Sequence, residues 1–497
     1  MISTLSWTLF VIAAGFQYVG SDTPGANAEG GQQVSEGQPP KLSADSGKLL
    51  LTPYIDACNY TTAKKLSKVT YFEKFTKADA YSGYITVNES TGSNLFFLFI
   101  EAAVKTDSTP LLLWTQGGPG LSALFGLFLE NGPAAFYSSE IILPRMSTLQ
   151  KHMSVIYVDL PVGAGFSYTN PDTYPKTLEE IVAHVMNFLK QFLELFQEYQ
   201  GRDIYLAGES YGARYSVAVA DHMLQTPEKL NVHLAGVIGG NGFLGPILET
   251  ADSSDFLYEV SMLTAEGRVN FSTQFKTMMG LLEPAAKNQS IALYLFKMLF
   301  STIFTNTPPT LFQNLTLYED HASPLHTKRP LHMQLCYLFL SNSKEFKKAI
   351  HVGEDAFFQY NHLPLIYSFA FDWFRDIRNM TQRVLDKTRM LVYLGQLDAL
   401  FPSVKQREHF AKLQWTHAEA YQKAIRTPWK PSSWESHRGF AGYTKKVTNF
   451  IETVLLNMSH YGAADRPDEV YELIMEFVNN STPVQSEAAG ALDEKKQ

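Results

Sequence analysis

The stretch YLAGESYGARY, residues Tyr205 to Tyr215, joins two different sequence patterns. An apolar run, Ile204 to Ala207, precedes the motif, and the mixed, helix-like segment Ser216 to Met223 follows it. Gly208 to Gly212 fits the pattern G-x-S-x-G, a sharp strand-to-helix turn that exposes a serine hydroxyl. Glycines flank such a serine because the turn leaves no room for Cβ atoms. The stretch predicts a nucleophile at Ser210, although the pattern alone also arises by chance.

Other short apolar runs recur along the chain, and helical stretches lie between several of them. The clearest helical stretch is Lys176 to Gln200, where apolar residues return at the spacing of one helix face. Apolar runs without alternation are typical of strands buried on both faces of a parallel sheet. This alternation predicts an α/β fold, preceded by a β-hairpin over Tyr81 to Glu101. The runs are Leu111 to Thr115, Val155 to Asp159, Ile204 to Ala207, Leu234 to Gly239, Met390 to Leu394 and Ile451 to Leu456.

The alternation breaks off in the middle of the chain, where the pattern is mainly helical. We therefore expect a helical cap insertion over residues 246–370, between a first core part (48–245) and a second core part (371–481). Residues 21–47 are rich in Gly, Ser, Gln and Pro and predict a disordered linker, and residues 482–497 predict a disordered tail.

The start of the chain predicts export. Leu5 to Val19 is apolar, too short to span a bilayer, and followed by small residues, so residues 1–20 are interpreted as a signal peptide. Nine N-x-Ser/Thr sequons agree with the secretory pathway, hence with a secreted or lysosomal protein. The sequons are at Asn59, Asn88, Asn270, Asn288, Asn314, Asn379, Asn457, Asn479 and Asn480.

Composition narrows the function further. A formal net charge of −8 over 497 residues argues against a nucleic-acid partner, because phosphate binding requires a basic face. Beyond the first residues, the sequence has no segment long and apolar enough to cross a membrane, so we expect no membrane partner. Cys58 and Cys336 permit one disulfide at most. The chain has no H-E-x-x-H motif or Cys/His cluster with ligand spacing, so no metal and no cofactor are expected.

A nucleophilic serine requires a base and a group that orients the base. On this type of sheet the expected chain order is serine, then carboxylate, then histidine, each on a loop after a strand. The predicted strand MLVYLGQLD ends at Asp398, and the next one, IETVLL, runs into NMSH, which ends at His460. We therefore predict that His460 is the base and Asp398 its orienting group. His437 is the nearest rival histidine, in a loop rich in Pro, Ser and Trp.

Acyl transfer also requires donors for an oxyanion. In LLLWTQGGPG a predicted strand ends at Thr115, and a glycine turn then leads into an apolar helix expected over Leu121 to Leu129. The backbone N–H groups of Gly118 and Tyr211 are the predicted donors. The alternative is a glycine turn without a ligand.

Five segments in this order resemble the serine carboxypeptidases, with the vitellogenic-like carboxypeptidases as the nearest branch. They are WTQGGPGLSALFGLFLENGP, VIYVDLPVGAGFSYT, LAGESYGARY, YLGQLD and NMSH, within Tyr71 to Val478. The resemblance implies an α/β-hydrolase fold with a mostly parallel central sheet and a helical cap. It gives Ser210, Asp398 and His460 the triad roles and Gly118 and Tyr211 the oxyanion hole.

The resemblance also implies a grip on the terminal carboxylate of a peptide or protein substrate, by Trp114, Gln116, Glu130 and Glu209. Two neighbouring carboxyl groups cannot both ionise cheaply, so one keeps a proton and can donate a hydrogen bond to that carboxylate. We therefore expect a serine-type carboxypeptidase favoured at acidic pH. Without the resemblance, Glu130 would be interpreted as a solvated charge at a helix end.

The segment around His460 departs from the family pattern. The family has G-H-x-x-P, whereas this chain has SHYGAADRP, and Leu121 stands where many members have cysteine. These departures leave open a catalytically impaired homologue that acts as a binding or protective protein. An acyltransferase or esterase that passes the acyl group to an alcohol with the same machinery is a second alternative. A homodimer also stays open.

Overall fold

The computed structural model describes residues 47–137, 141–226, 230–304, 309–360 and 362–480. The predicted signal peptide, residues 21–46 of the predicted linker and the predicted tail lie outside these ranges.

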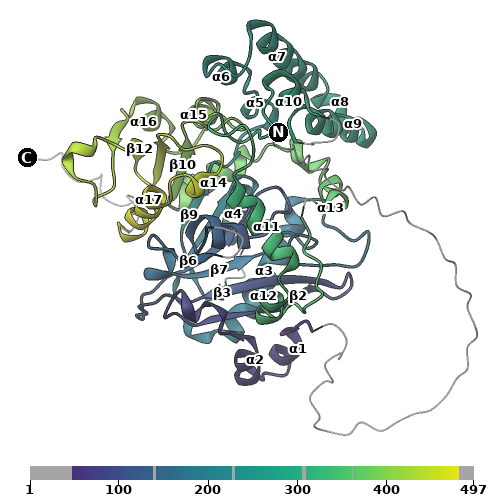
Figure 1. Ribbon diagram of the computed structural model, residues 1–497, viewed down its shortest axis with the longest axis vertical. Coiled ribbons are helices and arrows are strands. Elements are labelled where there is room, and N and C mark those ends of the chain that lie inside the picture. The colour runs from purple at the N-terminus through teal and green to yellow at the C-terminus, as the bar shows by residue number, and fades with distance from the viewer. Residues whose placement is uncertain (1–46, 138–140, 227–229, 305–308, 361, 481–497) are drawn as a thin grey trace, which may run out of the picture. The chain divides into compact units, whose positions relative to one another are not determined.

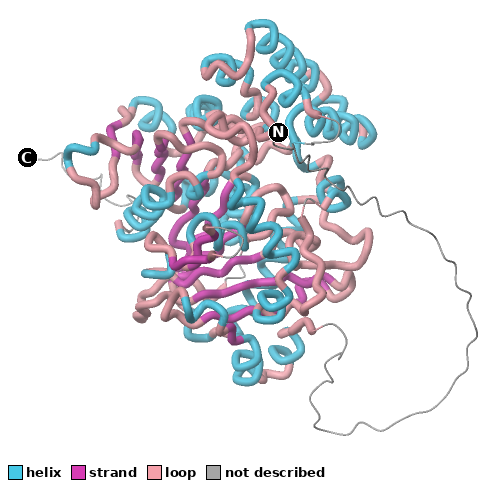
Figure 2. Tube along the Cα trace, in the orientation of Figure 1, coloured by secondary structure: helices cyan, strands magenta, loops and turns pink. Residues whose placement is uncertain are grey.

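One sheet runs through the centre of the described chain, where the strands appear in magenta between helices (Figure 2). Its strands are β1 (Lys68–Val69), β2 (Ala80–Asn88), β3 (Ser93–Ile100), β4 (Leu111–Thr115), β7 (Ser154–Val158), β8 (Asp203–Glu209), β9 (His233–Gly240), β10 (Met390–Gly395), β11 (Thr427–Trp429), β12 (Gly442–Val447) and β13 (Phe450–Leu455). Within the described residues these eleven strands follow the order β1-β2-β3-β7-β4-β8-β9-β10-β13-β12-β11.

The middle of this sheet is parallel. The strands β7, β4, β8, β9, β10 and β13 pair in parallel with one another in that order, and the pairs outside this block, from β1 to β7 and from β13 to β11, are antiparallel. The pair β2–β3 is the hairpin predicted over Tyr81 to Glu101. The carboxyl ends of the central strands therefore share one edge, where sites in α/β sheets lie.

Helices pack around the sheet and also form the segment between β9 and β10, where the described residues contain no strand. Figure 1 shows helices of this segment, in teal, gathered above the sheet in that view. The residues predicted as a cap, 246–370, belong to this segment. The helices are α1 (Thr52–Asp56), α2 (Tyr60–Ser67), α3 (Leu178–Leu195), α4 (Tyr211–Gln225), α5 (Ile247–Thr250), α6 (Ser254–Glu259), α7 (Ala265–Met279), α8 (Leu282–Lys287), α9 (Gln289–Leu299), α10 (Leu311–Thr316), α11 (Leu331–Asn342), α12 (Lys344–Ala349), α13 (Leu363–Ser368), α14 (Arg378–Lys387), α15 (Ser403–Lys412), α16 (Ala418–Lys423) and α17 (Pro467–Asn479).

The hydrophobic core has two parts, to which alternate residues of the strands contribute. On β3, Phe97 and Phe99 belong to one part, in which their rings meet Phe192 of α3. Phe96 and Leu98 belong to the other part, which also contains residues of α17. Every residue of β3 is buried, which explains the continuous apolar run of its sequence.

The helix predicted over Leu121 to Leu129 is wrong in its start and type. Asp159 Oδ1 accepts hydrogen bonds from the Ser122 hydroxyl and the Ala123 N–H, so these groups serve a turn instead of a helix. A π-helix then covers Gly126–Asn131. Gly126 lies against Trp114, because a Cβ at Gly126 would lie 2.1 Å from the indole Nε1.

The sequence prediction also missed β1, β11 and β12 and the small antiparallel sheet formed by β5 (Ala134–Phe136) and β6 (Ile142–Pro144). Each of these strands is six residues or shorter, which gives little periodic signal. In the described residues Cys58 and Cys336 are both free thiols, and no helix is long and apolar enough to cross a membrane.

Candidate active site

Ser210 occupies a sharp turn between β8 and α4. Its backbone angles are φ 54° and ψ −121°, a region that costs a non-glycine residue on the order of 1–3 kcal/mol. The Ser210 N–H donates to the carbonyl of Gly240 at 2.8 Å, which fixes the turn to the end of β9. A Cβ on Gly208 would lie 2.4 Å from the backbone of Gly212, and one on Gly212 would lie 2.5 Å from the Thr115 carbonyl oxygen. Both glycines of the motif are therefore required by close packing.

His460 and Asp398 lie beside this serine. The imidazole Nε2 of His460 is 3.1 Å from Ser210 Oγ, and its Nδ1 is 2.9 Å from Asp398 Oδ2. Because a carboxylate only accepts, Nδ1 carries the proton and Nε2 is left to accept from the serine hydroxyl. The other oxygen of Asp398 accepts from the N–H groups of Leu400 and Phe401, which hold the carboxylate in place. The structure thus brings the three predicted triad residues together.

The altered segment around His460 is held by its own contacts. Ser459, which replaces the glycine of the family pattern, is fully buried, and its N–H and hydroxyl both donate to Asp465 Oδ2. Asn241 Nδ2 donates to the carbonyl oxygens of Ser459 and His460, while its Oδ1 accepts from the Gly395 N–H. The His460 N–H donates to the Ala322 carbonyl in the segment between β9 and β10. The remodelled segment therefore still presents the imidazole to Ser210.

The glycine turn after β4 lies directly against the serine. A Cβ on Gly117 would lie 2.7 Å from Ser210 Cβ and 3.0 Å from the Tyr211 backbone nitrogen. The Gly118 N–H has no hydrogen-bond partner within the described ranges, and Tyr211 begins α4, where N–H groups have no partner in the helix. These two N–H groups are the predicted oxyanion donors, and both adjoin the serine turn.

The four residues predicted to hold a substrate carboxylate form one buried network. Trp114 Nε1 donates to Gln116 Oε1 at 3.0 Å. Gln116 Nε2 donates to both Glu130 Oε1 at 2.9 Å and Glu209 Oε2 at 3.0 Å. Glu130 lies in the π-helix, and Glu209 is the last residue of β8. The π-helix and the strand end thus bring two carboxyl groups together.

Burial controls the ionisation of this pair. The exposed fractions of Glu130 and Glu209 are 5% and 4%. Burial raises the pKa of Glu209 well above 4.5, and the neighbouring Glu130 raises that pKa further. Burial also raises the pKa of Glu130, while the hydrogen bond from Gln116 and the charge of the Arg145 guanidinium lower it. Both carboxyl groups accept from Gln116 Nε2, and their other oxygens, Glu130 Oε2 and Glu209 Oε1, are buried without a hydrogen-bond partner among the described residues. Two buried carboxyl groups on one amide favour the state in which one of them keeps its proton.

The comparisons with known proteins agree with this site. A model of the serine carboxypeptidase family matches residues 71–480. This chain belongs to the serine carboxypeptidase family. It is 30% identical over 450 residues to the probable serine carboxypeptidase CPVL of Homo sapiens, an alignment that covers 89% of this chain and 92% of the human protein. It is 28% identical over 447 residues to a vitellogenic carboxypeptidase of Aedes aegypti, with 89% of this chain and 92% of that protein covered.

A solved carboxypeptidase has the same fold. The crystal structure of Kex1(delta)p, a prohormone-processing carboxypeptidase from Saccharomyces cerevisiae, matches with a TM-score of 0.68 at 17% identity. The match covers 84% of this chain and 96% of that chain. The predicted α/β-hydrolase fold and the predicted family are therefore both confirmed.

Sequence reasoning missed two residues that support this candidate site, Asn241 and Gly462. Asn241 follows directly after β9. A polar residue at the carboxyl end of a strand is the sequence signal that could have identified it. Gly462 contacts Glu209, but a single glycine two residues after the histidine does not predict that contact. The rival His437 is exposed and pairs with Glu435, and the structure does not bring it to the triad.

Proposed function

We propose that this chain is a serine-type carboxypeptidase that removes C-terminal residues from peptides and proteins and works best at acidic pH. The observation that carries the proposal is the buried Glu130–Gln116–Glu209 network next to Ser210. A hydrolase that binds only the acyl part of its substrate has no use for such a pair of buried carboxyl groups. An enzyme that must bind a free carboxylate beside the scissile bond can use the pair to hold that carboxylate.

In the proposed reaction Ser210 Oγ attacks the carbonyl carbon of the last peptide bond while His460 Nε2 takes the hydroxyl proton. The N–H groups of Gly118 and Tyr211 hold the negative oxygen of the tetrahedral intermediate. His460 then protonates the leaving amine, and the acyl-enzyme forms. Water, activated by the same imidazole, releases the shortened peptide and restores Ser210.

The carboxyl pair gives the preference for acidic pH. While one carboxyl group keeps its proton, it can donate a hydrogen bond to the terminal carboxylate of the substrate. When both groups ionise at higher pH, they repel that carboxylate. Because burial raises the pKa of Glu209 well above 4.5, the protonated form persists at mildly acidic pH.

The test is hydrolysis of a blocked dipeptide with a free carboxylate at pH 5, beside its amidated twin. We expect release of the free amino acid from the first and at least tenfold slower cleavage of the second. Ser210→Ala should lower the rate roughly 10⁴-fold or more and abolish labelling by a fluorophosphonate probe. The matched control is Ser216→Ala, whose hydroxyl donates to the Gly212 carbonyl within α4. Labelling without release of an amino acid would favour the acyltransferase or esterase, and absence of labelling would favour the impaired homologue.

We also propose passage through the secretory pathway, to a secreted or lysosomal destination. In support, none of the nine sequon asparagines is buried, so each is accessible to a glycan. Asn457, three residues before His460, is exposed. Digestion of the protein from its native cells with an N-glycosidase should lower its apparent mass, and an unchanged mass would contradict the proposal.

A further inference from the structure

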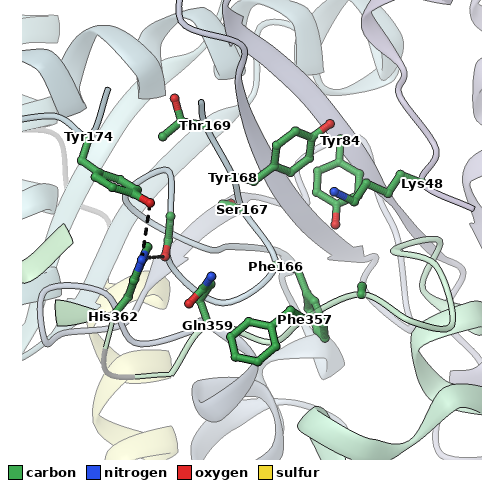
Figure 3. A pocket seen from close by; sticks show the side chains of 12 residues that line it. Lys48, Tyr84, Phe166, Ser167, Tyr168, Thr169, Tyr174, Phe357, Gln359 and His362 are labelled. Atoms are coloured by element: carbon green, nitrogen blue, oxygen red, sulfur yellow. Dashed lines mark hydrogen bonds between the residues drawn. The ribbon is translucent and has the colours of Figure 1, made fainter. Parts of the chain in front are cut away.

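A cavity separate from the catalytic residues opens between the start of the described chain and the loop after β7. Its volume is about 190 Å³, and none of its lining residues belongs to the triad, the oxyanion pair or the carboxyl network. Lys48, Tyr168, Phe357, Gln359 and His362 are among the side chains that surround it (Figure 3).

Lys48 is held in place by its backbone neighbours. Residue 48 bridges to Val352, and Leu50 bridges to Tyr84 of β2. The Lys48 Nζ atom lies 3.8 Å from the centre of the Tyr168 ring and 6.0 Å from that of Tyr84. Within the described ranges Lys48 forms no ion pair with a carboxylate, and it is half-buried. Burial lowers its pKa. The ammonium group of Lys48 has therefore lost part of its hydration in this cavity, and the aromatic rings are the partners that replace it.

The opposite wall offers a hydrogen-bonding group and apolar surface. Gln359 is fixed by two backbone hydrogen bonds with Gly165, and its amide points toward the cavity (Figure 3). His362 is already engaged, through Nδ1 with the Gly163 carbonyl and through Nε2 with the Tyr174 hydroxyl. Phe357 leaves 77% of its surface exposed beside the cavity, an apolar area that a bound ring would cover.

We propose that this cavity binds a small carboxylate that carries an aromatic ring. The unpaired Lys48 favours an anion, and its one positive charge balances the single charge of a carboxylate, whereas a phosphate group carries nearly two charges. Phe357 and the Tyr168 ring suit a flat apolar body. The volume is below the roughly 300–1,000 Å³ of sites for drug-sized ligands, so the ligand has the size of one residue. A free aromatic acid and the C-terminal residue of a peptide share this chemistry.

The test uses the full chain with Ser210→Ala, so that no probe is hydrolysed. Because the proposed carboxyl pair also binds carboxylates, binding to this cavity is measured as the part that Lys48→Met removes, which does not depend on the proposed catalysis. N-acetyl-phenylalanine is titrated at pH 7 by calorimetry, beside N-acetyl-phenylalanine amide. We expect saturable binding of the acid and at least tenfold weaker binding of the amide. Adding Lys48→Met should weaken binding of the acid roughly tenfold or more, because it removes one charge-assisted contact.

Lys74→Met is the matched control, because Lys74 Nζ also lies over a ring, that of Tyr71 at 4.3 Å, but does not line the cavity. This variant should bind the acid as tightly as its parent. Phe357→Ser changes a side chain that is largely in water, so it should fold normally and still weaken binding of the acid several-fold. This second variant keeps the proposal testable if Lys48→Met is unstable.

The probe Gly-Gly-Phe separates the two sources. Binding of this peptide that is as tight as that of N-acetyl-phenylalanine and is weakened by Lys48→Met assigns the cavity to peptide ends, and Lys48-dependent binding of the small acid alone assigns it to free acids. The proposal is overturned if the acid shows no saturable binding, if the amide binds equally well, or if Lys48→Met and Phe357→Ser both bind like their parent.

Discussion

Gly462 lies directly against Glu209: a Cβ atom on Gly462 would be 1.7 Å from Glu209 Oε1. Gly462 has φ +52° and stands two residues after His460. The segment that presents the imidazole therefore also forms a wall of the buried carboxyl pair. Through this contact the base of the triad and the proposed carboxylate grip depend on one short stretch of chain.

Gly462→Ala should lower kcat/KM for a substrate with a free carboxylate at least tenfold. The added methyl group has no space beside Oε1, so either Glu209 moves away from Gln116 or the His460 segment shifts. Positive φ alone costs an alanine roughly 1–2 kcal/mol. Gly439→Ala measures that cost separately, because Gly439 has φ +76° and nothing within 4 Å of a Cβ. Equal kinetics for the two variants would show that the contact has no role in activity.

Glu209→Gln should flatten the rise of KM with pH. In the native protein the pKa of Glu209 is raised, so its proton is present at low pH and is lost as the pH rises through the raised value. The KM for a carboxylate substrate should therefore increase over that range. A glutamine stays neutral at every pH, so the variant keeps a neutral side chain where the native pair ionises.

Initial rates at pH 4.5, 6 and 7.5, with a free and an amidated substrate, provide the measurement. Glu266→Gln, an exposed change on α7, is the control and should leave the pH profile of KM as it is. A KM profile in Glu209→Gln that still rises with pH as steeply as in the native enzyme would refute the role of the pair.

The sequence predicted those parts of the site that depend on local pattern. The Ser210 turn is set by two glycines and a buried strand, and Asp398 and His460 follow strands at their carboxyl ends, so order along the chain located them. Gly462 and Asn241 act through contacts between segments far apart in sequence, and no local pattern encodes such contacts. The turn that precedes the π-helix of Glu130 is held by Asp159, which is a contact between distant segments as well.

Asn241→Ala should lower kcat roughly tenfold to a hundredfold with little change in KM. Asn241 donates to the carbonyl groups of Ser459 and His460 and accepts from Gly395, so it positions the segment of the base without reaching the carboxyl network. A displacement of about 1 Å in a catalytic group can cost a hundredfold in rate.

Two further variants make this test specific. Asn241→Asp keeps the acceptor for Gly395 but loses the donor, so it should resemble the alanine variant. Asn231→Ala removes an exposed amide that bonds only to Gln200, and it should leave kcat as it is. If Asn241→Ala raised KM and kept kcat, Asn241 would belong to substrate binding and not to positioning of the base.

Asp159→Asn tests the buried carboxyl group that shapes the turn before Glu130. Its two oxygens accept from the Ser122 hydroxyl and the N–H groups of Ala123 and Phe166. Burial raises the pKa of Asp159 from 3.8 to about 6. Because the folded value is the higher one, this group's contribution to the free energy of unfolding falls as the pH rises from about 4 through 6. A shift of this size corresponds to roughly 3 kcal/mol.

The asparagine variant does not titrate at this position. The stability difference, meaning the free energy of unfolding of the native protein minus that of Asp159→Asn, should therefore decrease between pH 4 and pH 7.5 by an amount on the order of 3 kcal/mol. Urea unfolding at both pH values measures the difference. At pH 4 the variant should be less stable by about 1–3 kcal/mol, because one amide oxygen cannot accept from all three donors and the Phe166 N–H is left facing another donor. Asp107→Asn, on the surface, is the control and should show neither effect. A difference that stays constant from pH 4 to pH 7.5 would mean that Asp159 has the same pKa in the folded and unfolded chain, and burial would then not govern this carboxyl group.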